Sequence, residues 1–411
     1  MSLFSSQRRR IASHTFHFVH CGSLAVLLLA ASIVVFPGIG AGQTKSGTSK
    51  SFDSLSKKAA EARDADHIDE AVALYNQALL LRPKWAEGWW SLGTLEYDRN
   101  GYPAAARAFQ RFLALSPKDG TAYLMLGLCQ FELGQDDSAL KHIEAAEKLG
   151  VAKNTQLFQV MLYHEGLLLL RKARYENAQE VLQQLCRSGV ENTDVMRILG
   201  LAVFRLSPKA APPDNSPGAA LMQRAGHAEC LVGRKKFEEA RAEYKALIAE
   251  YPEFPDIHYV YGHFLLEGND TEAALPEFEK QLELVPGHLN ARLEIAAVKY
   301  RVDSAAGVPL AEQAVQIAPH LPFAHYLLGL LYADTNQFAK AIPELEIAQK
   351  AFPNEAQVYF ALGNAYAHIG RKAEAAKARA TFAKLNQEKA DSGTEGIDPG
   401  KPERNGRQPQ P

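Results

Sequence analysis

The stretch from Trp89 to Pro117, WWSLGTLEYDRNGYPAAARAFQRFLALSP, decides the fold, because its pattern returns along the chain. A small residue follows the first apolar run, and most steps from one such residue to the next are 34 residues long. The series is Ala59, Gly93, Gly127, Gly166, Gly200, Ala228, Gly262, Ala296, Gly329 and Gly363. A fixed period of this length indicates an internal structural repeat.

Two further series keep the same phase. Alanine recurs 12 residues after the small residue, at Ala71, Ala105, Ala139, Ala178, Ala240, Ala274, Ala341 and Ala375. Proline ends most units, at Pro83, Pro117, Pro252, Pro286, Pro319 and Pro353. Three series in one register are very improbable by chance, so the repeat extends over most of the chain.

Each unit has the pattern of two short amphipathic helices joined by a polar turn. Around Gly329, apolar residues fall at helical spacing on both sides of the turn DTNQ. Where two helices cross closely, only a small residue leaves room for the partner, so Gly329 and Ala341 mark the predicted crossing. The proline then ends the second helix. Each unit is therefore predicted to be a helical hairpin.

Residues 52 to about 386 resemble a tetratricopeptide repeat array. The closest matches are WWSLG with AAARAFQRFLALSP, YLMLG with SALKHIEAA, HYVYG with AALPEFEKQLELVP, HYLLGLLY with AIPELEIAQKAFP, and YFALGNAY. The resemblance implies an all-α fold, a right-handed superhelical solenoid of helix-turn-helix hairpins. A single hairpin cannot bury its own apolar face, so neighbouring hairpins must stack.

The repeat is interrupted once, in the segment SPKAAPPDNSPG of residues 207–218. Its four prolines exclude a helix, so we expect few contacts across it. The predicted organisation is an N-terminal repeat block (52–206), the proline-rich interruption (207–218) and a C-terminal repeat block (219–386). The polar, Gly- and Pro-rich residues 387–411 are predicted to be a disordered tail.

The N-terminal residues have the layout of an export signal. Arg8, Arg9 and Arg10 precede the charge-free apolar run LAVLLLAASIVVF of residues 24–36. Residues 1–42 are therefore predicted to be a signal peptide or a membrane anchor through residues 22–41, followed by a linker at 43–51. The repeats are expected outside the cytoplasm, either periplasmic or secreted, or anchored in a bacterial inner membrane.

Three cysteines follow this segment: Cys129, Cys186 and Cys230. Their number is odd and no CxxC spacing occurs, so neither a disulfide framework nor a zinc site is indicated. Each lies among apolar neighbours and is predicted to be a small buried hydrophobic residue.

No enzyme motif is present. The sequence has no phosphate-binding GxxxxGK loop, no GxSxG elbow and no CxxCH haem site, so no catalytic residue, metal ligand or cofactor is predicted. The chain has 45 basic and 47 acidic residues, a net charge of -2, and no long basic stripe beyond the N-terminus. Nucleic acid is therefore not an expected partner.

The resemblance implies a binding groove whose wall is formed by first-helix side chains. The residues at those positions are mainly aromatic, which favours an extended peptide or a partner helix: Trp90, Tyr97, Phe131, Tyr259, Tyr326, Phe360 and Asn364. The alternative is that several of them pack between hairpins.

The predicted function is a non-catalytic scaffold that binds a protein or peptide on the exported side of the inner membrane. Two alternatives stay open. One is an accessory subunit of an envelope assembly or secretion machine, and the other is an enzyme with an unrecognised site.

Overall fold

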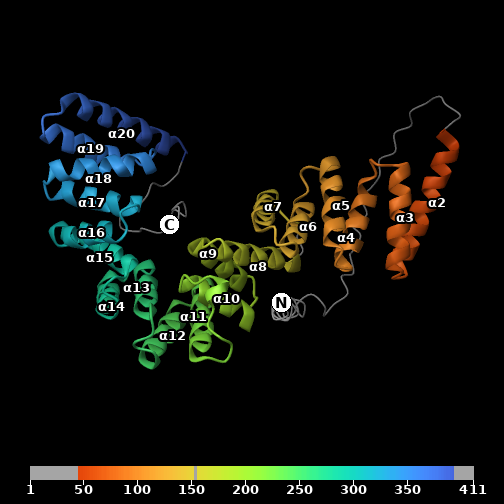
Figure 1. Cartoon of the computed structure of the whole chain (residues 1–411), viewed down its shortest axis with the longest axis horizontal. Helices are drawn as coiled ribbons and strands as arrows, with labels where there is room; N and C mark the ends of the chain where they lie inside the picture. The colour runs from red at the N-terminus through yellow and green to blue at the C-terminus, as the bar shows by residue number, and fades with distance from the viewer. Residues whose placement is uncertain (1–44, 152–154, 393–411) are drawn as a thin grey trace, which may run out of the picture. The chain divides into compact units, whose positions relative to one another are not determined.

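The computed structural model describes residues 45–151 and 155–392, which form nineteen α-helices, one short 3-10 helix and no strand (Figure 1). The predicted all-α class is confirmed. The chain divides into two units, residues 1–53 and 54–411. Of the first unit only the start of α2 is described, and helices α3 to α20 all belong to the second.

The N-terminal helices, up to the proline-rich interruption, follow one another with short connections. Their bounds are α2 Lys45–Asp64, α3 Ile68–Leu81, α4 Ala86–Asp98, α5 Tyr102–Leu115, α6 Gly120–Glu132, α7 Asp136–Leu149, α8 Thr155–Arg171, α9 Tyr175–Arg187 and α10 Thr193–Val203. The 3-10 helix η2, Pro208–Ala210, lies within the interruption.

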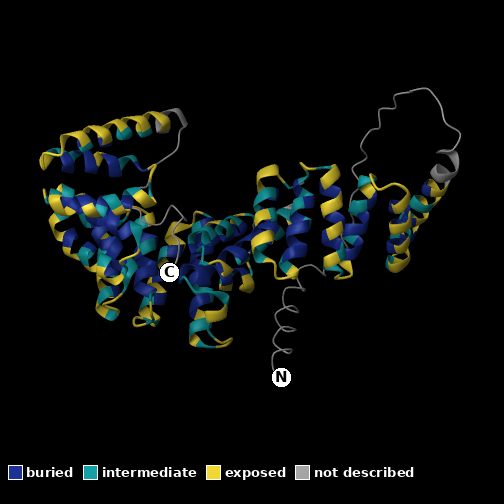
Figure 2. Ribbon diagram, turned by 45° about the horizontal axis from the view of Figure 1, so that its top comes forward, coloured by how far each residue is buried: buried dark blue, intermediate teal, exposed yellow. Residues whose placement is uncertain are grey.

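The helices after the interruption continue the same arrangement. Their bounds are α11 Pro217–Gly233, α12 Phe237–Glu250, α13 Ile257–Glu267, α14 Thr271–Leu284, α15 Leu289–Val302, α16 Ser304–Ile317, α17 Pro322–Asp334, α18 Phe338–Ala351, α19 Ala356–His368 and α20 Lys372–Ser392. Consecutive helices pack as hairpins, from α4 with α5 to α19 with α20, and each second helix also packs on the following first helix. Figure 2 shows buried residues on the facing sides of these helices.

The small residue of each unit lies where the two helices cross, as predicted. A methyl carbon built on Gly329 would lie 2.6 Å from Cγ of Leu345 on the second helix. On Gly262 it would lie 2.8 Å from the ring of Phe278. Both distances are too short for an unmoved neighbour, so the close approach of the helices depends on the missing side chain.

Six of the hairpin turns have a non-glycine residue in the left-handed region, with φ between 55° and 61°: Asp66, Asn100, Ala173, Lys235, Asn269 and Asn336. In two others this residue is Gly134 or Gly370, with φ 70° and 83°. The next backbone N–H donates to the carbonyl five residues earlier, as from Gly101 to Glu96 at 2.7 Å. This is the Schellman ending of a helix. Asn and Asp tolerate the left-handed region better than Ala or Lys.

A second recurring bond ties consecutive units together, and we call it the proline clasp. The carbonyl of a terminating proline accepts a hydrogen bond from the side chain six residues later, at 2.6 to 2.9 Å. The pairs are Trp89 with Pro83, His258 with Pro252, Arg292 with Pro286, His325 with Pro319, and Tyr359 with Pro353. The clasp satisfies a backbone carbonyl in the connection just beyond the end of the helix.

Helix α10 departs from the hairpin pattern, because the prolines after it replace its second helix with a loop and η2. Helix α11 packs tightly on α10 instead. A methyl carbon on Gly200 would lie 1.9 Å from the carbonyl oxygen of Met222, and one on Gly226 would lie 1.7 Å from that of Met196. The expectation of few contacts across residues 207–218 is therefore wrong.

The two ends of the array also differ from the predicted boundaries. Helix α2 begins at Lys45, so residues 45–51 are helical rather than a linker. Helix α20 continues to Ser392, into the predicted tail. The predicted signal or anchor segment, residues 1–42, and residues 393–411 lie outside the described part of the chain. Within the described part, none of the helices is both long and apolar enough to span a membrane.

Candidate binding site at the helical junction

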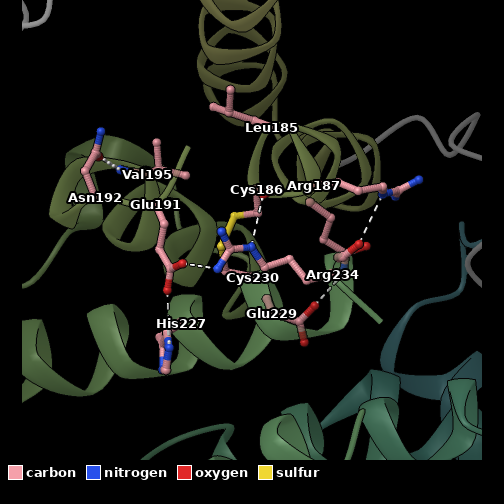
Figure 3. The surroundings of a disulfide bond; sticks show 12 residues. Leu185, Cys186, Arg187, Glu191, Asn192, Val195, His227, Glu229, Cys230 and Arg234 are labelled. Atoms are coloured by element: carbon pink, nitrogen blue, oxygen red, sulfur yellow. Dashed lines mark hydrogen bonds and ion pairs between the residues drawn. A yellow bond between two sulfur atoms is a disulfide. The ribbon is translucent and has the colours of Figure 1, made fainter. Parts of the chain in front are cut away.

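The junction, which we define as α9 to α11 with residues 204–216, contains a disulfide bond between Cys186 and Cys230 (Figure 3). It joins α9 to α11 with a Cα–Cα distance of 5.4 Å, and the two cysteines are 44 residues apart in the sequence. The prediction that these cysteines are simple buried hydrophobic residues is wrong. Cys129 does fit that prediction, since it is buried and free, and burial raises the pKa of its thiol to about 12.

Polar contacts surround the disulfide (Figure 3). The guanidinium of Arg187 donates to the carbonyl of Gly233 at 3.1 Å, and that of Arg234 donates to the carbonyl of Cys186 at 3.3 Å. Glu191 pairs with Arg234 and lies 3.5 Å from Nε2 of His227. Helix α11 is thus tied to α9 at both sides of the disulfide.

Glu229 of α11 adds a buried carboxyl group to the junction, with only 3% of the residue exposed. Its Oε2 accepts hydrogen bonds from the amides of Gln179 at 2.7 Å and Gln183 at 2.6 Å, and its Oε1 accepts one from the hydroxyl of Tyr244. Burial raises the pKa of Glu229, while these three donors act to lower it. One side chain therefore connects α9, α11 and α12.

Beside this network lies a pocket of about 330 Å³, which we call the junction pocket. It is lined by residues from α9, the end of α10, and the starts of α13 and α15: Tyr175, Val203, Phe204, Arg205, Leu206, Asp256, Tyr259, His288 and Asn290. A second cavity of about 20 Å³ shares four of these residues and reaches Glu229. The junction pocket is in the size range of small-ligand sites, and the second cavity has room for about one water molecule.

Arg205 supplies the positive charge in the pocket wall. It is the left-handed residue that ends α10, with φ 54°, and its N–H groups pair with the carboxylate of Glu176. Its guanidinium carbon lies 5.6 Å from the centre of the Tyr175 ring. Arg205 is therefore balanced by Glu176 and rests on an aromatic face, which is a favourable environment for a cation.

Asp256 supplies a negative charge that no cation balances within the pocket lining. Its Oδ1 lies 3.1 Å from Nε2 of His288 and accepts from the Gln281 amide at 3.3 Å. Nδ1 of His288 accepts from the backbone N–H of Ala291 at 3.0 Å, so this nitrogen carries no proton. The ring is then neutral, with the proton on Nε2 directed at Asp256.

The predicted groove residues are distributed over several surroundings. Trp90 packs on Phe109 and Phe112 of its own hairpin, and Tyr97 packs on Tyr102. Phe131 stacks edgewise on His164, under the guanidinium of Arg171 at 4.4 Å. All three are half-buried. Their packing partners are neighbouring side chains, as the packing alternative describes, and their binding role stays a prediction.

The C-terminal members of the set differ from one another. Tyr326 is fully buried between Phe323 and Phe352, so its ring is part of the core. Phe360 is 45% exposed and Asn364, one helical turn later, is half-buried. Tyr259, only 4% exposed, is the one predicted residue that lines the junction pocket.

Sequence reasoning missed Tyr175, Arg205, Asp256, His288 and Asn290, which complete the pocket with Tyr259. The only signal was the proline cluster after Arg205, which marks the missing helix. No group of three or more His, Cys, Asp or Glu side chains among the described residues is placed to hold a metal ion. The pocket therefore offers rings, one unbalanced carboxylate and amide groups.

Comparison with known families gives a direct match. The tetratricopeptide repeat model matches residues 91–150, 227–288 and 326–381. These three segments are tetratricopeptide repeats, as the sequence pattern predicted. The matched segments cover hairpins on both sides of the junction, while α9 and α10 lie outside them. The family fold is that of a protein-interaction scaffold.

The solved structures that match this chain share little sequence with it. MamA (41-end) from Desulfovibrio magneticus RS-1 is 26% identical, covers 42% of this chain and 97% of its own, and has a TM-score of 0.37. A tetratricopeptide repeat protein from Parabacteroides merdae ATCC 43184 is 18% identical over 69% and 99%, with a TM-score of 0.30. Yeast Tom70 is 14% identical over 84% and 90%, with a TM-score of 0.31. No curated protein matches the chain.

Proposed function

We propose that the chain is a non-catalytic scaffold that binds a segment of a partner protein in the junction pocket. The observation that carries the proposal is the pocket itself, about 330 Å³ in volume and lined by tyrosines, at the point where the array lacks a helix. Concave sites with aromatic walls and a few polar groups are the usual places for ligands.

A protein partner fits the chain better than nucleic acid or a reaction centre. The net charge is -2, and the pocket lining holds one guanidinium that is already paired with Glu176. A phosphate backbone needs unpaired cations. Arg205 pairs with Glu176 and Asp256 contacts His288, and the pocket lining has no nucleophile next to a base.

We also propose that the repeats lie on the exported side of a bacterial inner membrane. Two features support this location. The N-terminal sequence has arginines before an apolar run, and Cys186 and Cys230 form a disulfide. Disulfides form and persist mainly in oxidising compartments outside the cytoplasm.

The test is site-specific photo-crosslinking in the native cell. A photoreactive amino acid at Asn290, in the pocket lining, should give a defined adduct with one partner, identified by mass spectrometry. The matched control places the same amino acid at Asp69, whose side chain is 94% exposed on a distant hairpin. An absent adduct at position 290, or the same adduct at both positions, would contradict the proposal.

A further inference from the structure

We infer that the junction pocket selects a basic side chain, lysine or arginine, from the partner segment. This inference rests on the proposed function and specifies the chemistry of what the pocket binds. It starts from the balance of charges in the wall.

The carboxylate of Asp256 has no positively charged partner in the pocket lining. Glu176 neutralises Arg205, and the neutral ring of His288 cannot neutralise Asp256. Both observed contacts of Asp256 use Oδ1, which leaves Oδ2 for another donor. The pocket therefore has a net negative charge next to the rings of Tyr175 and Tyr259, and this combination favours a cation.

The backbone at Asp256 gives an independent reason to assign it a role. The residue stands at the N-cap of α13 in the left-handed region, with φ 67°, and its side chain makes no capping bond. An aspartate at this place ordinarily accepts from the N–H groups of its own helix. Here the carboxylate is directed to His288 and the pocket instead. Such a conformation is retained where the surroundings fix it, often at binding sites.

The wall already holds a cation of the proposed kind. The guanidinium of Arg205 lies over the Tyr175 ring and pairs with Glu176, so an aromatic face with a carboxylate accommodates this group here. Tyr259 and Asp256 offer a second such combination in the same pocket, and both contact His288, whose ring centre lies 4.9 Å from that of Tyr259. A partner's lysine or arginine would occupy this second position.

The experiment compares three probes on the full chain: N-acetyl-arginine amide, N-acetyl-norleucine amide and N-acetyl-glutamate amide, with affinities from saturation-transfer NMR. The arginine probe should bind about threefold to fivefold more tightly than the other two, because the Asp256 side chain is 36% exposed and solvent screens its attraction for a cation. Asp256→Asn should reduce the arginine affinity about threefold to fivefold, whereas the matched Asp69→Asn should leave it unchanged.

Each outcome decides the inference. Equal binding of arginine and norleucine, no binding of the arginine probe, or an unchanged affinity in Asp256→Asn overturns it. The crosslink from position 290 keeps the two proposals separable. If the partner adduct forms but the pocket does not prefer the arginine probe, the scaffold function is supported and the selection of a basic side chain is contradicted. If no adduct forms, the scaffold function itself is contradicted.

Discussion

The α17–α18 hairpin and the α10–α11 pair achieve close helix packing in different ways. In the hairpin, the added methyl on Gly329 would first meet Cγ and Cδ2 of the Leu345 side chain, at 2.6 and 2.8 Å, which would have to shift. In the pair, the methyl on Gly200 or Gly226 would meet a backbone carbonyl, which cannot move without the helix. Alanine occurs at the crossing of a regular unit, as at Ala296, where the facing helix carries Gly307, whereas the junction has glycine on both helices.

The bonds that hold the two regions also differ. The regular units repeat the same small devices, the Schellman turn and the proline clasp. The junction uses contacts that occur once: the disulfide, the Glu229 carboxyl group and the Arg234 bonds. Where the repeat loses a helix, specific bonds take the place of the general pattern.

The largest effect is expected from removing the disulfide. Cys186→Ser with Cys230→Ser should lower the unfolding free energy by about 3 to 4 kcal/mol, since the bond closes a loop of 44 residues. Denaturant unfolding measures the loss. A thiol reductant should bring the wild type to the same stability and should leave the double variant unchanged.

Trypsin tests the same bond without mutation. Lys209 is exposed in the interruption, so cleavage after it should give two fragments, one carrying Cys186 and the other Cys230. The fragments should migrate together on a non-reducing gel and separate only after reduction. Separation without reductant would contradict the disulfide.

The second prediction compares the stability cost of alanine at the α10–α11 crossing with its cost at the α17–α18 crossing. Gly226→Ala should cost about 2 to 3 kcal/mol, because its methyl would lie 1.7 Å from the carbonyl oxygen of Met196. Gly329→Ala should cost only about 1 kcal/mol, because the Leu345 side chain can shift. Thermal or denaturant unfolding of the two variants provides the measurement. Equal losses would show that the junction is no tighter than a regular hairpin.

The third prediction is that replacing two buried glutamates by methionine changes the unfolding free energy in opposite directions. Glu229→Met should destabilise by about 2 kcal/mol, because three donors lose their acceptor. Glu165 of α8 is instead a buried carboxyl whose Oε2 has no hydrogen-bond partner, and burial with nearby Glu147 and Glu144 raises its pKa to about 7. Glu165→Met should therefore stabilise the chain by about 1 to 2 kcal/mol at pH 8.

The pH dependence follows from the raised pKa of Glu165. The folded state holds this proton more tightly than the unfolded state, whose pKa is near 4.5. Protonation of Glu165 therefore contributes its full stabilisation of the folded state below pH 4.5, and this contribution is lost as the pH rises to about 7. Unfolding curves across this range should show less decline in Glu165→Met than in the wild type. An unchanged decline would exclude Glu165 as its source.

The smallest effect concerns the turn that leads into α9. Ala173 occupies the left-handed position with φ 55°, where most other turns have Asn, Asp or Gly. Ala173→Gly should stabilise by about 0.5 to 1 kcal/mol, because glycine adopts this conformation without steric cost. Asn336→Gly is the matched control and should change stability by only a few tenths of a kcal/mol. A melting temperature that falls in Ala173→Gly would contradict the assignment.

The hairpins could be predicted because their signal is periodic and local. Gly329, Ala341 and the terminating proline each constrain neighbours within one unit, so the pattern survives even where single residues change. The four prolines after Arg205 likewise predict a missing helix from local chemistry alone.

The junction and its pocket depend on tertiary packing that no local signal encodes. Cys186 and Cys230 meet only because α11 packs on α9, and the sequence contains no spacing rule for that contact. The pocket gathers Tyr175, Arg205, Asp256 and His288 from four segments that together span more than a hundred residues of the sequence. The burial of Tyr326 also follows from its neighbours rather than from its position in the repeat.

The proline clasp has a consequence for how such arrays vary. Indole, imidazole, guanidinium and phenol groups all make the same bond, from Trp89, His258, Arg292 and Tyr359 among others. The site demands a donor of sufficient reach and is indifferent to residue type. A consensus sequence derived from the units would show no residue preference at the position six residues after the proline. A designed array could therefore carry an aromatic, a charged or a titratable side chain at each unit boundary and keep the hydrogen bond to the proline carbonyl throughout.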